Sequence, residues 1–178
     1  VLLDAFQAVI LMVGIVIAAI IAVKPIGGVS ELFRVTAENA PELLSRPGPQ
    51  GTYTGPYWLM QFIVLPFGIW LCPHIWTKSL MAKDAKSLSK SAISVPVSQV
   101  LIFGFSALLI GLAAHQLLSG VDRADSVLPL MMIQYSNWFI AALVMAAAIS
   151  AGMSTINSML LSSAQIVSQD LIFYNTRD

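Results

Sequence analysis

The chain of 178 residues is 57% hydrophobic and only 10% charged, with a mean hydropathy of +0.82. Soluble globular domains carry about 25% charged residues, so this composition excludes an ordinary soluble domain and predicts an all-α integral membrane protein. Nine basic and nine acidic residues give a net charge of zero, which argues against nucleic acid as a partner. The single cysteine, Cys72, excludes an internal disulfide.

Four apolar stretches are each long enough to cross a bilayer, which takes roughly 20 helical residues. We expect spans at about residues 2–23, 57–76, 95–118 and 138–167, within a single transmembrane domain over residues 1–178. The connecting loops are then 24–56, 77–94 and 119–137. Because the sequence opens inside an apolar run, we interpret it as a fragment of a longer multi-pass protein.

The distribution of lysines predicts the orientation. Loop 77–94 is short and rich in lysine, whereas loops 24–56 and 119–137 carry mixed charges. Short loops rich in lysine or arginine stay in the cytoplasm. We therefore expect loop 77–94 and both ends of the chain to be cytoplasmic, and the other two loops to lie outside a plasma or inner membrane.

The connector at 24–56 is too polar to cross the membrane. Within it, residues 30–44 can form a short surface helix whose apolar contacts are Leu32, Phe33, Leu43 and Leu44. Connections of this length often act as a lid or gate. In the later external loop, the segment after Pro129 is too short to span but apolar enough to cap the protein.

The second span is interrupted. Pro66, Gly68 and Pro73 fall within eight residues, and each proline removes a backbone donor and disfavours helix in the residue before it. Unwound backbone at membrane depth persists where it lines a cavity, and transporters bind their solutes at such breaks. The alternative is a simple proline kink, which is common in membrane helices.

The fourth span carries a polar face. Ala151, Ser154, Thr155 and Ser158 stand at helical spacing i, i+3, i+4 and i+7. A ridge of small residues overlaps this face at every fourth position, at Ala142, Ala146, Ser150, Ser154, Ser158 and Ser162. Such ridges let another helix approach closely, and a contact lined by hydroxyls could hold a dehydrated cation. The alternative is that the hydroxyls only bond to carbonyls four residues earlier.

Asp4 and Gln7 lie three residues apart on the first span. An acid in a membrane helix is a functional candidate, although an acid at a helix start is also favoured by the helix dipole. The sequence shows no phosphate-binding loop, zinc motif or nucleophile elbow, and His74 and His115 lie on different spans. We therefore expect no enzyme.

Four motifs together resemble the sodium:solute symporter family. They are Asp-Ala-Phe-Gln at 4–7, Cys-Pro-His at 72–74 followed by Met-Ala-Lys-Asp at 81–84, Asp-Ser-Val-Leu-Pro at 125–129, and Met-Ser-Thr-Ile-Asn-Ser at 153–158. The resemblance covers nearly the whole chain in the family's order. It implies core helices five to eight of the ten-helix, inverted-repeat (LeuT-like) fold, with the remaining helices of the same transporter as partners.

The resemblance also implies the site residues. Sodium would be held by the carbonyl of Ala151 and the hydroxyls of Ser154 and Thr155, and Asp4 would help sodium leave toward the cytoplasm. The solute would bind at the break, at Phe67, Trp70 and Pro73. Leu65 and Ile69 stand where the amino-acid branch has aromatic residues, which argues against a proline-type solute.

These observations predict sodium-coupled symport of a small organic solute, and the stretch at 73–78 is closer to branches that carry monocarboxylates or pantothenate. The rival is a pore-forming or accessory membrane subunit in which the small-residue ridge serves assembly only. It predicts that Ser154 and Thr155 tolerate alanine and that any flux is independent of sodium.

Overall fold

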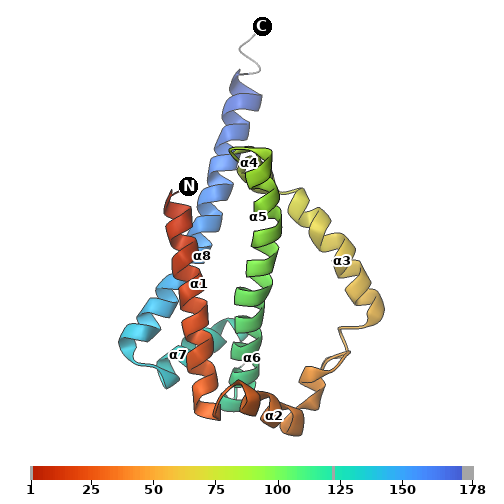
Figure 1. Ribbon diagram of the computed structural model, residues 1–178, viewed down its shortest axis with the longest axis vertical. Coiled ribbons are helices and arrows are strands. Elements are labelled where there is room, and N and C mark those ends of the chain that lie inside the picture. The colour runs from red at the N-terminus through yellow and green to blue at the C-terminus, as the bar shows by residue number, and fades with distance from the viewer. Residues whose placement is uncertain (1, 122, 174–178) are drawn as a thin grey trace. The chain divides into compact units, whose positions relative to one another are not determined.

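The computed structural model describes residues 2–121 and 123–173, and this part of the chain contains helices and no strand (Figure 1). Residues 1, 122 and 174–178 lie outside the described residues. They are the two ends of the predicted domain and one position of the predicted external loop 119–137. The α-helices are α1 (Leu2–Val23), α2 (Val29–Asn39), α3 (Gly55–Trp70), α4 (Pro73–Leu80), α5 (Ala85–Ser98), α6 (Phe105–Leu117), α7 (Val127–Tyr135) and α8 (Trp138–Gln165). Short 3-10 helices are η1 (Lys24–Ile26), η2 (Pro41–Leu44) and η4 (Ala124–Ser126), and π-helices are η3 (Gln99–Gly104) and η5 (Ile166–Phe173). The all-α prediction is confirmed for the described residues.

Three helical stretches are long and apolar enough to cross a membrane, namely Leu3–Ile26, Ala85–Leu117 and Trp138–Gln169. A fourth span results if α3 and α4, which are bent by 64° at their junction, are counted together. The number of spans therefore agrees with the prediction when the bent pair is one span, and the bend falls in the span predicted to be broken.

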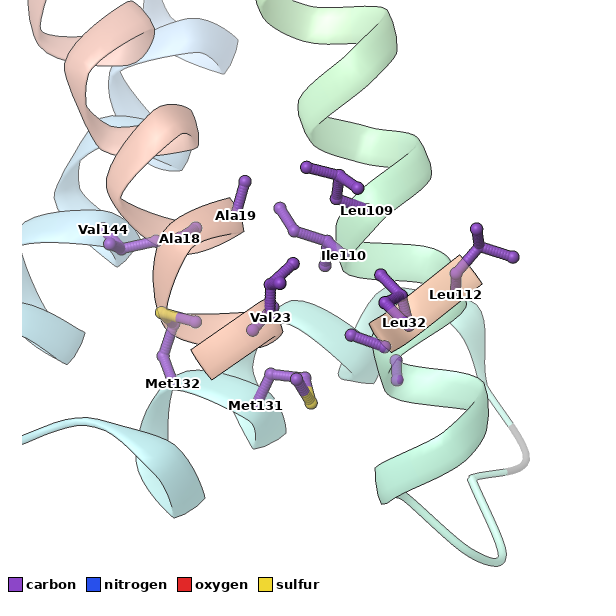
Figure 2. Packing of buried hydrophobic residues seen from close by; sticks show 13 residues of the cluster. Ala18, Ala19, Val23, Leu32, Leu109, Ile110, Leu112, Met131, Met132 and Val144 are labelled. Atoms are coloured by element: carbon purple, nitrogen blue, oxygen red, sulfur yellow. The ribbon is translucent and has the colours of Figure 1, made fainter. Parts of the chain in front are cut away.

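Contacts divide the chain into two compact units. Unit 1 is Val1–Thr54 with Val95–Ala151, and unit 2 is Gly55–Ser94 with Gly152–Asp178. The apolar core lies in unit 1, where Figure 2 shows side chains of α1, α2, α6, α7 and α8 packed together. Alanines on α1, among them Ala18 and Ala22, are fully buried, because small side chains let neighbouring helices approach closely.

Helices α1 and α8 meet most closely at Gly14. A Cβ atom placed on Gly14 would lie 2.4 Å from the Cβ of Ala147, so only glycine fits here without a shift of one helix. The predicted ridge does not make this contact, since Ala142 and Ala146 are exposed while Val144 and Ala147 are buried. The spacing of small residues indicates which face of α8 could be approached closely by another helix. The position of the neighbouring helix α1 determines which face of α8 is buried.

Helix α2 is docked on unit 1 by its apolar face, as its pattern predicts. Leu32 and Thr36 are fully buried, and the Thr36 hydroxyl donates to the Leu32 carbonyl at 2.7 Å. At the end of the helix, Asn39 Nδ2 donates to Gln116 Oε1 of α6 at 3.3 Å. Figure 1 shows α2 lying across the end of α6, and the two helices are in contact within unit 1.

The solvent face of α2 carries an ion-pair triad. Arg34 Nε donates to Glu31 at 3.0 Å and Arg34 Nη1 donates to Glu38 at 2.6 Å. The hydrogen bond from Arg34 lowers the pKa of Glu31, and the same partners raise the pKa of Arg34. Leu44, predicted as an apolar contact, is exposed, because η2 ends there and the chain turns outward.

In unit 2 the interruption of the predicted second span is confined to the junction of α3 and α4. Helix α3 continues through Pro66 to Trp70, and only Leu71 and Cys72 separate it from α4. The interruption therefore falls at the Pro73 end of the stretch from Pro66 to Pro73. Pro66 removes one backbone bond inside an otherwise apolar helix, whereas Pro73 opens α4, where a missing N–H costs nothing. Cys72 is extended, at φ −77° and ψ 116°, as expected before proline.

Helix α5 begins at Ala85, well before the predicted start at residue 95. The backbone N–H of Ser87 donates to Asp84 Oδ1 at 2.6 Å, which satisfies an amide that the first turn leaves open. The hydrogen bonds from Ser87 lower the pKa of Asp84. This cap lets the helix start in the polar lysine loop, and Pro96 lies inside the helix.

Candidate functional site

The three predicted sodium ligands lie on α8. Ala151 is half-buried and is the last residue of unit 1. Ser154 and Thr155 belong to unit 2, where Ser154 is half-buried and Thr155 is exposed. All three lie within the residues of α8 (Trp138–Gln165).

Further along α8, Ser158 and Ser162 are buried, with 7% and 4% of their surface exposed. The Ser158 hydroxyl donates to the Ser154 carbonyl at 2.9 Å, and the Ser162 hydroxyl donates to the Ser158 carbonyl at 2.9 Å. These two hydroxyls thus bond to the carbonyls four residues earlier, the arrangement that the sequence offers as the alternative for Ser154 and Thr155. Their oxygens still have lone pairs, which remain able to accept.

One hydroxyl contact joins α8 to the short helix α4 within unit 2. Thr77 Oγ1 lies 3.3 Å from Ser162 Oγ. Thr77 also donates to the carbonyl of Pro73, the first residue of α4, at 3.1 Å. The contact places α4, directly after the break, against the polar face of α8.

The break carries an aromatic pocket of about 420 Å³. Its lining residues are Pro66, Phe67, Trp70, Leu71 and Trp76. The indole rings of Trp70 and Trp76 meet edge to face with centroids 5.2 Å apart, a favoured geometry for aromatic pairs. The Trp76 indole N–H donates to the Trp70 carbonyl, which fixes the Trp76 ring across the break.

The structure therefore brings two of the predicted solute residues, Phe67 and Trp70, to one pocket. Pro73 is the first residue of α4 and does not line it. Trp76 lines the pocket although sequence reasoning did not select it. The sequence feature that could have indicated Trp76 is its position in the first turn after Pro73, since the 64° bend there brings this residue back toward Trp70.

Asp4 and Gln7 belong to unit 1. Asp4 lies half-buried in the first turn of α1. Gln7 is 7% exposed, and its Oε1 has no hydrogen-bond partner among the described residues. The described residues also contain no cluster of three or more His, Cys, Asp or Glu side chains that could hold a metal ion.

The comparison with protein families assigns the chain to a class of membrane transporters. The Sodium:solute symporter family matches residues 1–177, so the chain belongs to this family and the resemblance of its motifs is confirmed. A symporter family also agrees with the prediction that the chain is not an enzyme.

Two relatives are similar over most of the chain. The sodium/pantothenate symporter of Haemophilus influenzae is 28% identical over 96% of this chain and 35% of its own length. The sodium/pantothenate symporter of Escherichia coli is 27% identical over the same shares. The chain thus spans about a third of the length of these curated relatives. No solved structure matches the chain.

Proposed function

We propose that the chain is part of a sodium-coupled symporter that carries a small organic acid, pantothenate or a related monocarboxylate, across the cell membrane. The family match over residues 1–177 carries this proposal. Both relatives are sodium/pantothenate symporters, which supports pantothenate as the solute. The chain's partners would be sodium, the solute, lipid and the remaining helices of a LeuT-like core.

We propose Ala151, Ser154 and Thr155 as the sodium ligands. A backbone carbonyl and two hydroxyls are neutral oxygens, and sodium is a hard cation that prefers oxygen. In unit 2, Ser154 and Thr155 are consecutive residues of α8. Bound sodium would stabilise the solute-competent state, so that sodium and solute raise each other's affinity by the same factor. We also propose that the Asp4 carboxylate helps sodium leave toward the cytoplasm.

The aromatic pocket of unit 2 is the proposed solute contact. Phe67, Trp70 and Trp76 offer flat apolar surfaces, which suit the carbon skeleton of an organic acid rather than its carboxylate. Pro73 would contribute by fixing the start of α4. The carboxylate would then be bound by other groups, and the pocket would select the apolar part of the solute.

The direct test is uptake of labelled pantothenate by the full-length protein in liposomes. We expect an inward sodium gradient to drive accumulation, whereas an equal potassium gradient should not. Lactate and acetate serve as competitors that distinguish pantothenate from short monocarboxylates. If pantothenate moved only down its own concentration gradient and at a rate independent of sodium, the result would instead support a pore-forming or accessory subunit.

Replacing an aromatic side chain of the pocket should weaken solute binding. Phe67→Ala should raise the pantothenate concentration for half-maximal uptake by roughly three- to tenfold, since one aromatic contact contributes about 0.5–1.5 kcal/mol. Phe62→Ala is the matched control, because Phe62 is an exposed aromatic on the same helix that does not line the pocket. An equal effect of both variants would contradict a solute contact at Phe67.

The orientation proposed for the chain can be tested by labelling. In a Cys72→Ala background, Ser87→Cys should resist a membrane-impermeant maleimide in intact cells and react after permeabilisation, because the lysine loop is expected inside. Ser45→Cys, in the connector 24–56, should react in intact cells. Both positions are exposed in the structure, so reaction of Ser87→Cys in intact cells would reverse the topology.

A further inference from the structure

A continuous series of hydrogen bonds runs through unit 2, from the ion-binding face of α8 to the break before α4. Ser158 donates to the Ser154 carbonyl and Ser162 donates to the Ser158 carbonyl, each at 2.9 Å. The Ser162 oxygen then lies 3.3 Å from that of Thr77. Thr77 completes the series by donating to the Pro73 carbonyl at 3.1 Å.

The two hydroxyls in the middle of this series cannot make all of their bonds at once. Thr77 and Ser162 each have one proton, yet three bonds need a donor: one to each carbonyl and one between the hydroxyls. Their separation of 3.3 Å is longer than the usual 2.7–2.8 Å for O–H···O, which agrees with one proton being shared between a carbonyl and the neighbouring hydroxyl. A small movement of α4 along α8 would change whether the Thr77 hydroxyl donates to the Pro73 carbonyl or to the Ser162 oxygen.

The position of this pair connects the two proposed sites. Thr77 follows Trp76, which lines the aromatic pocket, and donates to Pro73, where α4 begins. Ser162 lies two helical turns from Ser154, a proposed sodium ligand, and is linked to it through Ser158. Ser162 is 4% exposed, so water cannot easily replace the Thr77 hydroxyl beside it.

We propose that Thr77 and Ser162 are positioning residues that hold α4 against α8 and thereby couple sodium binding to solute binding. The inference rests on the proposed function, and it assigns the coupling to one pair of hydroxyls. Neither residue touches the ion or the solute in this scheme. Each fixes the distance between the helix that presents the ion ligands and the helix that completes the pocket.

The test is equilibrium binding to the purified full-length protein, measured by its tryptophan fluorescence. The quantity of interest is the factor by which saturating pantothenate lowers the sodium concentration for half-maximal binding. Thr77→Val and Ser162→Ala should each reduce this factor by about threefold or more, because each removes one hydrogen-bond partner from a buried contact. The double variant should be no worse than either single variant, and Thr77→Ser should keep the wild-type factor.

Two matched controls separate coupling from general damage. Ser79→Ala removes a hydroxyl of α4 that donates to the Ile75 carbonyl at 2.9 Å, the same kind of back-bond that Thr77 makes. Ser163→Ala changes the exposed neighbour of Ser162. Both should keep the wild-type factor. If Thr77→Val does not fold, Thr77→Ala and Ser162→Ala remove the same contact without added bulk.

The outcomes distinguish this inference from the proposed function. Sodium-dependent binding with an unchanged factor in Thr77→Val and Ser162→Ala would overturn the coupling role and leave the symporter proposal standing. Additive losses in the double variant, or equal losses in the controls, would also overturn it. Absence of any sodium dependence in the wild-type protein would instead overturn the proposed function, and the inference with it.

Discussion

Thr155→Ala in the full-length protein should raise the sodium concentration needed for half-maximal uptake by at least about tenfold. A dehydrated ion has few oxygen ligands, so removal of one hydroxyl takes away a substantial share of its coordination. A loss of about 1.4 kcal/mol already corresponds to a factor of ten. The measurement is initial uptake of labelled pantothenate over a range of sodium concentrations.

Conservative variants at the same position separate ligation from packing. Thr155→Ser keeps the oxygen and should stay near wild type, whereas Thr155→Val keeps the shape and should resemble the alanine variant. Ser158→Ala should be milder, because the Ser158 hydroxyl already donates to the Ser154 carbonyl. If all three replacements of Thr155 show the same sodium dependence, the hydroxyl is not a ligand.

Adding a single methyl group at the crossing of α1 and α8 should destabilise unit 1. Gly14→Ala would place a Cβ 2.4 Å from the Cβ of Ala147, and neither atom belongs to a flexible side chain that could move away. Overpacking of this kind costs about 1–3 kcal/mol. We expect a lower melting temperature for the detergent-purified full-length protein.

Helix α6 provides the control for this prediction. Gly111 is also a helical glycine of unit 1, but a Cβ placed on it would meet nothing within 4 Å. Gly111→Ala should therefore be neutral or slightly stabilising, since alanine favours helix over glycine by up to about 1 kcal/mol. Equal melting temperatures for the two variants would contradict the close contact at Gly14.

The elements could be predicted from the sequence because the strongest signal is hydropathy. A run of about 20 apolar residues has few alternatives to a spanning helix. The predicted spans 2–23 and 138–167 therefore lie close to the observed bounds of α1 and α8. The short helix α2 could also be predicted, and three of its expected apolar contacts, Leu32, Phe33 and Leu43, lie in the core or pack against it. The start of α5 could not be predicted from hydropathy. The Ser87 N–H donates to Asp84 Oδ1 and so caps the helix, which therefore begins within the polar lysine loop.

The positions that depend on a neighbouring helix could not be predicted. The small-residue ridge passes through Ala146, yet the buried contact uses Ala147. The sequence alone could not tell which proline interrupts the second span, because a proline in a helix interior and a proline at its first position look alike in the sequence. Trp76 was missed for the same reason, since only the bend brings it to Trp70.

The difference in burial between parts of the chain has a consequence for assembly. The described residues 55–94, which include all of α3 and α4, contain no buried residue, whereas α1, α2, α6 and α7 share a core in unit 1. We expect the helices of unit 1 to associate soon after membrane insertion, because their own contacts already bury apolar surface. The exposed apolar side chains of α3 are surfaces that we expect the remaining helices of the transporter to cover.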